Sequence, residues 1–292
     1  MIANDVAQTD LWRSLKEDLA NASALQRSAL LTEEARQRRR QNVRMISEAG
    51  QGHIGGDMSV TDILTVLYCH ILRIDPANPA WPDRDRLVMS KGHCAGALYT
   101  ALASCGFIPS SELSTFMAPG SRLNGHPNRL KVPGVEANTG PLGHGLPIAV
   151  GIAHAGMLRS ARYRVFAVLG DGEMQEGSNW EALMSAAHYQ LSNLCAVIDR
   201  NRLQQGAPTE ETNALDPLAE RLHAFGWEVR TVDGHDFEAL IDAFEPSSGG
   251  RPVAVVANTT KGKGISFMED DVSWHHKVPT DEQVRTALEE LA

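Results

Sequence analysis

The chain has 292 residues, of which 42% are hydrophobic, and its formal net charge at pH 7 is −9. This length suits one large α/β domain, so we expect a single domain over residues 1–292 with a helical N-terminal extension at 1–50. The negative charge argues against nucleic acid or an anionic membrane as the main partner, because phosphate surfaces bind basic proteins.

The first part of the chain is predicted to be helical. Residues 8–50 read as helical, because no proline or glycine occurs from Thr9 to Ala49. A second helix is expected from Ser59, interpreted as its N-cap with Asp62 placed to complete the capping box, to about Leu72.

The next segment contains a short strand and a long connection. Residues 86–89 are predicted to form the strand, which ends in the sequence SKGH, and a helix follows to about Cys105. Residues 106–143 are rich in Gly, Pro and Asn, and we expect an ordered loop with a short helix near 110–116. Loops of this length in compact domains are usually functional.

From Gly145 onward the pattern becomes regular. A helix of small residues is expected from Gly145 to about Arg159, and a last helix at about 280–291. Between them we expect strands near 165–169, 194–198, 227–232 and 253–258, separated by helices near 177–190, 214–225 and 236–245. Apolar strands that alternate with helices predict an α/β fold, in which helices flank both faces of a parallel sheet.

The cysteines and the N-terminus indicate the compartment. Cys69, Cys94, Cys105 and Cys195 form no CxxC pair, which is typical of thiols in a reducing environment. The N-terminal residues lack the basic region and apolar core of a secretory signal. No apolar run has the length of a membrane span. We therefore expect a cytoplasmic protein that has no membrane partner.

Two of the expected strands end in polar residues that should meet at one edge of the sheet. Asp171 stands between two glycines after the first strand, and Asn201 follows the second about thirty residues later. The carboxyl edge of a parallel sheet is where α/β proteins bind ligands. A carboxylate and an amide oxygen suit Mg²⁺, whose other ligands are water and phosphate oxygens. The alternative is a simple turn and a helix cap, since Gly and Asp are common turn residues.

An ordered set of motifs resembles the transketolase family of thiamine diphosphate enzymes. GDG-x-x-x-EG, followed by a buried strand and D-x-N, is similar to the thiamine diphosphate signature. The segments that narrow the resemblance are GQGHIGG near 50–56, SKGH at 90–93, GHP at 125–127, NTGPLGHG at 138–145, GDGEMQEG at 170–177, DRNRLQQG at 199–206 and KGKG with WH within 261–275. The resemblance implies a thiamine-diphosphate-binding fold.

The resemblance also implies two cofactors, thiamine diphosphate and Mg²⁺. By analogy with transketolases, Asp171, Asn201 and the backbone carbonyl of Leu203 would bind the Mg²⁺ ion. Asn201 would also belong to the cofactor-binding set, and Gly172 would lie against the diphosphate. Glycines without a side chain allow such a close approach of the backbone to a phosphate.

Further cofactor contacts follow from the same resemblance. Gly140 and Leu142 resemble the residues that approach the aminopyrimidine ring. Glu176 resembles a glutamate that lies near the cofactor at a subunit interface, and His93 would contact the diphosphate.

Three other histidines match catalytic positions of the family. His53 and His275 would contact substrate hydroxyls and the diphosphate, and His126 would bond a hydroxyl of the ketose donor. Imidazole titrates near neutral pH, so it suits proton removal from a hydroxyl. For a single histidine a surface or core role is the commoner case, but several within glycine-rich segments favour an active site.

The sequence indicates the roles of four other basic side chains less clearly. His144 stands where many transketolases have glutamine, so its role is open. His276 is expected only to share the loop of His275. Lys261 and Lys263 are interpreted equally well as contacts to an anionic substrate or cofactor and as parts of a flexible solvated loop.

The resemblance covers only the N-terminal part of a full-length transketolase. The pyrimidine-binding half is absent from this sequence, so we expect a split enzyme in which a separate C-terminal transketolase subunit completes the site. An α₂β₂ assembly, an exposed apolar interface and inactivity of the isolated chain would follow. The sequence His53-Ile-Gly-Gly56, where full-length transketolases read His-Pro-Gly, resembles the split bacterial subunits.

The expected activity is the transfer of a two-carbon ketol unit from a ketose phosphate to an aldose phosphate. The alternatives are one chain of a 2-oxoacid dehydrogenase, a fragment of a deoxyxylulose-phosphate synthase, and a non-catalytic binding subunit. The first of these would lack this set of histidines, and the second would be longer in one chain. A dinucleotide-binding enzyme ranks low, because no GxGxxG follows an expected strand.

Overall fold

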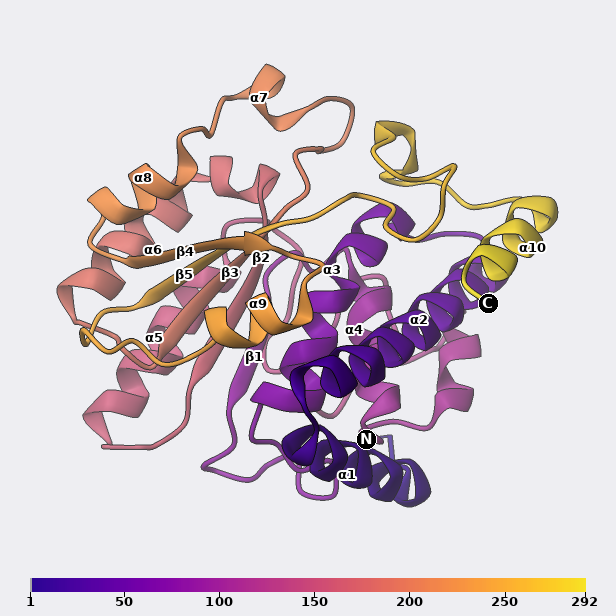
Figure 1. The fold of residues 1–292 in the computed structure, drawn as a ribbon, viewed down its shortest axis with the longest axis horizontal. Helices are drawn as coiled ribbons and strands as arrows, with labels where there is room; N and C mark the ends of the chain where they lie inside the picture. The colour runs from indigo at the N-terminus through magenta and orange to yellow at the C-terminus, as the bar shows by residue number, and fades with distance from the viewer. Residues whose placement is uncertain (1) are drawn as a thin grey trace.

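A five-stranded parallel sheet forms the centre of the computed structural model, which describes residues 2–292 (Figure 1). The strands are β1 (Arg86–Met89), β2 (Val165–Gly170), β3 (Leu194–Arg200), β4 (Glu228–Asp233) and β5 (Val253–Asn258). Their order in the sheet is β1-β2-β3-β5-β4, and every neighbouring pair is parallel. β2, β3 and β5 are almost entirely buried apolar runs, as expected for strands that are covered on both faces.

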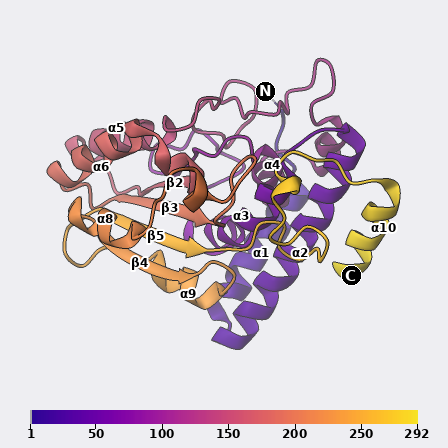
Figure 2. The ribbon, with the colours of Figure 1, turned by 90° about the horizontal axis from the view of Figure 1, so that it is seen from above.

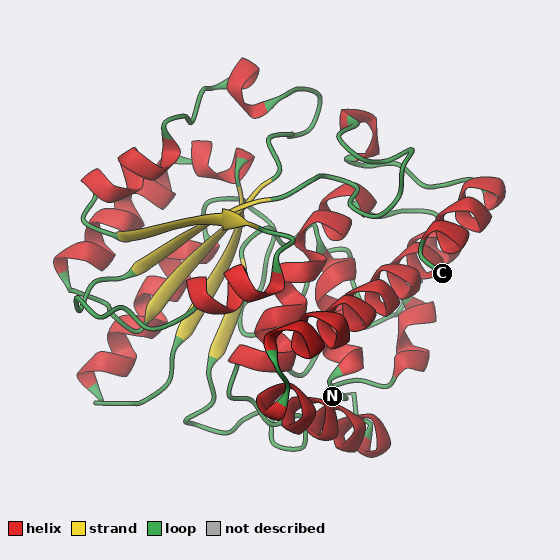
Figure 3. Cartoon of the chain, viewed as in Figure 1, coloured by secondary structure: helices red, strands yellow, loops and turns green. Residues whose placement is uncertain are grey.

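Helices cover both faces of this sheet (Figures 2 and 3). One face carries α2 (Ala24–Ala49), α3 (Ile54–Val66), α4 (Ala95–Ser104) and α9 (Phe237–Ala243), and the other carries α5 (Gly145–Leu158), α6 (Gly177–His188) and α8 (Leu218–Ala224). Alternate residues of β2 point to opposite cores, because side chains alternate along a strand. Phe166 and Val168 pack on the side of α2, whereas Ala167 and Leu169 pack on the side of α5.

The helical structure expected over residues 8–50 is present, but it is divided into two helices. α1 (Val6–Asn21) ends before Ser23, which caps α2. The Ser23 side chain accepts a hydrogen bond from the Gln26 backbone, and the Gln26 side chain accepts one from the Ser23 N–H at 3.1 Å. This capping box stabilises the start of α2, so the chain turns without needing glycine or proline.

The helix start expected at Ser59 is wrong, because α3 already begins at Ile54. Ser59 is buried inside α3, and its Oγ donates a hydrogen bond to Asp199 at 2.6 Å. Glycine at position 55 lets this first turn of α3 pack against the backbone of Trp274. A Cβ atom there would lie only 2.6 Å from the Trp274 carbonyl oxygen. The helix then continues into a π-helical turn at Leu67–Ile71.

The other elements agree with the expected order and differ in length. The helix expected over 214–225 is shorter, because α8 begins only after Pro217. The remaining helical segments are α7 (Thr209–Thr212), α10 (Asp281–Glu290) and 3₁₀ turns at Ser110–Thr115, Gly172–Gln175 and Val272–Trp274. All four cysteines are buried as free thiols. Among residues 2–292, no helix combines the length and the apolar character needed to cross a membrane.

Candidate active site

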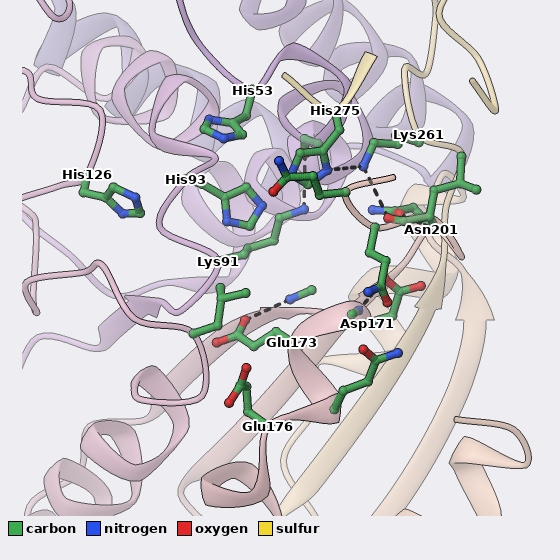
Figure 4. A pocket seen from close by; sticks show the side chains of 18 of the residues that line it. His53, Lys91, His93, His126, Asp171, Glu173, Glu176, Asn201, Lys261 and His275 are labelled. Carbon is green, nitrogen blue, oxygen red and sulfur yellow. Dashed lines mark hydrogen bonds between the residues drawn. The ribbon is translucent and has the colours of Figure 1, made fainter. Parts of the chain in front are cut away.

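A cavity of about 500 Å³ lies at the carboxyl ends of β2 and β3 (Figure 4). These strands are neighbours, with Gly170 paired to Asp199, so the residues that follow them meet at one edge of the sheet. All eleven site residues expected from the sequence line this cavity: His53, His93, His126, Gly140, Leu142, Asp171, Gly172, Glu176, Asn201, Leu203 and His275. Their individual roles stay predictions. His144 is exposed and is not among the lining residues.

Asp171 supplies a buried carboxylate on the sheet side of the cavity. One carboxylate oxygen accepts a hydrogen bond from the Gly172 N–H at 2.8 Å, and the other accepts from the Arg202 N–H at 2.5 Å and from Arg200 at 3.1 Å. Burial and the neighbouring Asp199 carboxylate raise the pKa of Asp171, while Arg200 opposes that shift.

Two further oxygens lie beside Asp171 in the same wall. The Asn201 side-chain oxygen accepts a hydrogen bond from the Leu203 N–H at 3.1 Å, and the Leu203 carbonyl accepts one from Lys261 Nζ at 3.3 Å. An ammonium group thus already contacts one of these oxygens. A carboxylate, an amide oxygen and a carbonyl form a hard oxygen set, which fits Mg²⁺ when a phosphate completes the coordination.

The described residues contain no cluster of three or more His, Cys, Asp and Glu side chains that could hold a metal ion. The oxygen set here has a single carboxylate, Asp171. Such a set fits a cation that takes its remaining ligands from water and from a bound phosphate.

The floor of the cavity leaves room for an anionic group. No atom lies within 4 Å of where a Cβ atom of Gly140 would stand, and a Cβ atom at Gly172 would approach the Gln204 side chain to 3.0 Å. Gln204 Oε1 is buried and has no hydrogen-bond partner within residues 2–292. Buried polar atoms usually have a partner, so this accepting oxygen on the cavity wall fits a hydrogen-bond donor or a cation beside the anionic group. Lys91 and Lys261 supply positive charge to the same cavity.

Three histidine rings form a compact cluster above this floor (Figure 4). The ring centroid of His53 lies 5.1 Å from that of His93 and 5.5 Å from that of His275. Burial, followed by nearby positive groups, lowers the pKa of His53 to about 4 and that of His275 to about 3. The pKa of His93 also falls well below its usual value for the same reasons. All three imidazoles are therefore neutral at pH 7, and each has one nitrogen that accepts and one that donates. In His275 the accepting nitrogen is Nδ1, which lies 3.0 Å from the Lys261 ammonium.

His126 lies outside this cluster but lines the same cavity (Figure 4). It comes from the long loop between α4 and α5, and its Nδ1 lies 3.1 Å from the Thr139 hydroxyl. Burial lowers the pKa of His126. The long loop is thus ordered over the cavity.

The structure decides between the two interpretations of the KGKG segment. Lys261 is only 2% exposed, and its Nζ lies 3.0 Å from His275 Nδ1. Burial and the nearby Lys91 lower the pKa of Lys261 to about 8. Lys263 is instead partly exposed and lies 3.8 Å from Glu269. Lys261 therefore belongs to the cavity wall, whereas Lys263 lies on the surface.

Sequence reasoning missed Lys91, which is buried at the base of the cavity. Lys91 Nζ forms an ion pair with Asp199, and Asp199 also accepts hydrogen bonds from Ser59 and Thr259. Burial favours the neutral amine, but the Asp199 carboxylate outweighs this effect and raises the pKa of Lys91. Lys91 stands in the SKGH motif two residues before His93, so the ion pair joins the segment that carries His93 to the end of β3.

Glu173 is a second buried residue that was missed. Its carboxylate accepts hydrogen bonds from the Ser90 hydroxyl, from the Gly143 N–H at 3.0 Å and from the Gly170 N–H at 3.1 Å. It thereby joins three segments that line the cavity: SKGH, TGPLG and GDG. The only sequence signal was its position inside GDGEMQEG, because its partners lie far away in the chain.

Comparison with known protein families places most of the chain in one family. The family described as "Transketolase, thiamine diphosphate binding domain" matches residues 32–291. One of the subunits of the apulose-4-phosphate transketolase of Actinobacillus succinogenes is 48% identical over 84% of this chain and 89% of that protein. The 6-deoxy-6-sulfo-D-fructose transketolase subunit SqwG of a Clostridium species is 41% identical over 84% of this chain and 90% of that protein.

Solved structures show the same relationship in three dimensions. Transketolase from Campylobacter jejuni superposes with a TM-score of 0.85 and 31% identity, covering 89% of this chain and 42% of that one. Transketolase from Leishmania mexicana gives a TM-score of 0.83 and 28% identity, covering 89% of this chain and 41% of that one. The chain therefore spans less than half of these enzymes, whereas it spans about nine tenths of the two bacterial subunits.

Proposed function

The chain belongs to the transketolase family as a thiamine diphosphate-binding N-terminal subunit, and from this membership we propose how it works. It binds thiamine diphosphate through Mg²⁺, and together with a separate C-terminal subunit it transfers a two-carbon ketol unit between sugar phosphates. The observation that carries the proposal is one cavity in which the oxygen set of Asp171 faces the neutral histidine cluster.

The charged and polar residues of the cavity are proposed to bind the cation and the diphosphate. Asp171, Asn201 and the Leu203 carbonyl would hold Mg²⁺, and Lys261 would place a positive charge beside a bound diphosphate. When bound, thiamine diphosphate supplies a nucleophilic carbon and an electron sink. The chain itself binds and orients both reactants and keeps water away from the reacting atoms.

The histidines are proposed to bind the hydroxyls of the substrate and to take part in proton transfer. His53 is neutral at pH 7, so it can accept a proton from a substrate hydroxyl. His275 accepts from Lys261 at Nδ1, so its Nε2–H is the group that donates a hydrogen bond to the substrate. Lys261 lies 3.0 Å from His275 Nδ1 and fixes the orientation of that ring. His126 hydrogen-bonds a hydroxyl of the ketose donor.

Replacement of His126 tests the last of these roles. His126→Ala should lower kcat/KM for the ketose donor by about 10–100-fold, because one oriented hydrogen bond to the substrate is lost. Steady-state ketol transfer by the assembled enzyme measures this change. His223→Ala, an exposed histidine on α8, is the matched control and should behave as the wild type. Unchanged kinetics of His126→Ala with every donor would remove His126 from the substrate site.

The donor proposed first is apulose 4-phosphate. Two of the related subunits, 48% and 45% identical to this chain, carry that substrate in their names. The relative named for 6-deoxy-6-sulfo-D-fructose is 41% identical, which makes that sugar the second candidate. Parallel ketol-transfer assays on both sugars and on xylulose 5-phosphate rank the donors by kcat/KM.

We propose that the partner is a C-terminal transketolase subunit that carries the pyrimidine-binding half, and that two copies of each assemble as α₂β₂. The names of the related proteins, which call them subunits, support a separate partner. Exposed apolar side chains at the cavity and on α5 and α6 support its position. Leu142 lies at the cavity, Ile148 is 40% exposed on α5, and Met184 is 55% exposed on the adjacent α6. A cytoplasmic location, expected from the sequence, is part of the same proposal.

A charge on this apolar face should weaken the assembly. Ile148→Asp would bury a carboxylate without a partner, so the affinity for the C-terminal subunit should fall at least about tenfold. Isothermal titration calorimetry with the purified partner measures the affinity. Leu25→Asp is the control, because Leu25 is 83% exposed at the start of α2, on the opposite face of the sheet. Equal affinities of both variants would contradict a docking site on α5.

A further inference from the structure

A small side chamber adjoins the main cavity and contains a histidine to which no role is assigned. The chamber has a volume of about 90 Å³ and shares His53, His93 and His126 with the main cavity. Phe116, Met117 and His276 close its other sides. At the roughly 30 Å³ that a water molecule occupies in the liquid, the chamber accommodates about three water molecules or a group of similar size.

The ring of His276 lies next to the histidine cluster of His53, His93 and His275. Its ring centroid lies 4.7 Å from that of His53, closer than those of His93 at 5.1 Å and His275 at 5.5 Å. The side chain is exposed, and no hydrogen bond engages its ring among residues 2–292. Both ring nitrogens of His276 are therefore available to a ligand at the mouth of the chamber.

The lining of the chamber indicates what kind of group it takes. Four imidazoles supply donors and acceptors on one side, and Phe116 and Met117 supply an apolar wall on the other. The residues that line the chamber include no lysine, arginine, aspartate or glutamate, in contrast to the main cavity with Lys91, Lys261 and Asp171. A phosphate would lack a strong counter-charge here, whereas a carbon that bears a neutral hydroxyl would match both the polar and the apolar side.

We propose that His276 is a specificity-determining residue, which hydrogen-bonds a hydroxyl-bearing substituent of the sugar substrate in this side chamber. The substituent projects from the reacting part of the sugar, because the chamber opens beside His53, His93 and His126. A donor sugar that lacks a hydroxyl at this position leaves His276 without a hydrogen-bond partner. Its ketol unit is therefore transferred less efficiently. This inference rests on the proposed ketol transfer and adds a determinant of donor choice to it.

The test compares donors and variants in the assembled enzyme of both subunits. His276→Ala removes the ring, and His276→Asn keeps a side chain that can donate and accept a hydrogen bond. Lys277→Ala is the matched control, because Lys277 is the exposed neighbour and its ammonium lies over the Trp274 ring instead. The donors are xylulose 5-phosphate, fructose 6-phosphate and apulose 4-phosphate, and the affinity for thiamine diphosphate is measured in parallel.

For His276→Ala we expect a loss of about tenfold in kcat/KM for the best donor, mainly through KM, and a smaller loss for at least one other donor. The cofactor affinity should stay within about twofold of the wild type, and His276→Asn should recover part of the loss. Equal losses for all donors, a parallel loss of cofactor affinity, or wild-type kinetics would overturn the proposal.

The two proposals fail in different ways. If the wild-type enzyme transfers no ketol unit from any donor, the proposed function is wrong. His276 is then tested by calorimetric binding of the same sugar phosphates to the wild-type and His276→Ala enzymes. Weaker binding to the variant supports the side-chamber role, and equal binding overturns it.

Discussion

Asp171→Ala should abolish the Mg²⁺-dependent binding of thiamine diphosphate. Asp171 supplies the single carboxylate of the oxygen set, and its loss leaves the cation with two neutral protein oxygens, those of Asn201 and Leu203. Outer-sphere substitutions around a metal typically weaken its binding about 10–100-fold, so removal of the charged ligand should weaken it more than about 100-fold. The fold should survive, because Arg200 keeps its ion pairs with Glu210 at 2.7 Å and Asp216 at 3.1 Å.

Calorimetric titration of the assembled enzyme with thiamine diphosphate, with Mg²⁺ and with a chelator, measures this loss. Asp233→Ala is the matched control, because Asp233 ends β4 at the same edge of the sheet but does not line the cavity. The control should bind the cofactor as the wild type does. If Asp171→Ala kept its Mg²⁺-dependent affinity, the metal site would have to lie elsewhere.

Lys91→Met should destabilise the chain by about 3–5 kcal/mol, the usual cost of leaving one partner of a buried ion pair uncompensated. The side chains of Lys91 and Asp199 are 2% and 0% exposed, so water cannot replace the lost ammonium. The hydrogen bonds from Ser59 and Thr259 to Asp199 remain, and they place the expected loss at the lower end of this range.

Urea unfolding of the purified chain measures the change in the free energy of unfolding. Lys263→Met is the control for loss of a lysine at an exposed ion pair, and it should change stability by less than about 0.5 kcal/mol. The double variant Lys91→Met, Asp199→Asn removes both charges and should recover most of the loss. If Lys91→Met were as stable as the control, the ion pair would not hold the base of the cavity together.

The strands and the main site could be predicted because their signals are local. The apolar runs of β2 and β3 end in Asp171 and Asn201, and parallel neighbours must bring such ends together. Glycine-rich segments in a recognisable order then indicated the histidines. The inferences on the strands and on Asp171 and Asn201 needed only residue type, spacing and strand direction, whereas the histidines were implied by the resemblance to transketolases.

One helix start was not predicted and another was predicted wrongly, for opposite reasons. Ser23 carries a true capping box with Gln26, but an uninterrupted helical composition on both sides concealed it. Ser59 has the sequence of a cap, yet it lies inside α3, because its hydroxyl donates to Asp199 and α3 begins at Ile54. A serine hydroxyl can satisfy a cap or a distant carboxylate, and the sequence alone does not distinguish these uses.

The missed site residues depend on contacts between segments far apart in the chain. Lys91 and Asp199 are 108 residues apart, and Glu173 accepts hydrogen bonds from Ser90 and Gly143. Lys261 is a wall residue only because the loop after β5 folds back onto the cavity. These pairings arise from the tertiary structure, and no periodicity or spacing encodes them.

The most direct test of the proposed function is ketol transfer by this chain with its C-terminal partner, assayed with thiamine diphosphate and Mg²⁺ on apulose 4-phosphate, 6-deoxy-6-sulfo-D-fructose and xylulose 5-phosphate. We expect activity only when both chains and both cofactors are present, and none from either chain alone. Binding of partner and cofactors without ketol transfer from any of these donors would contradict the proposed function.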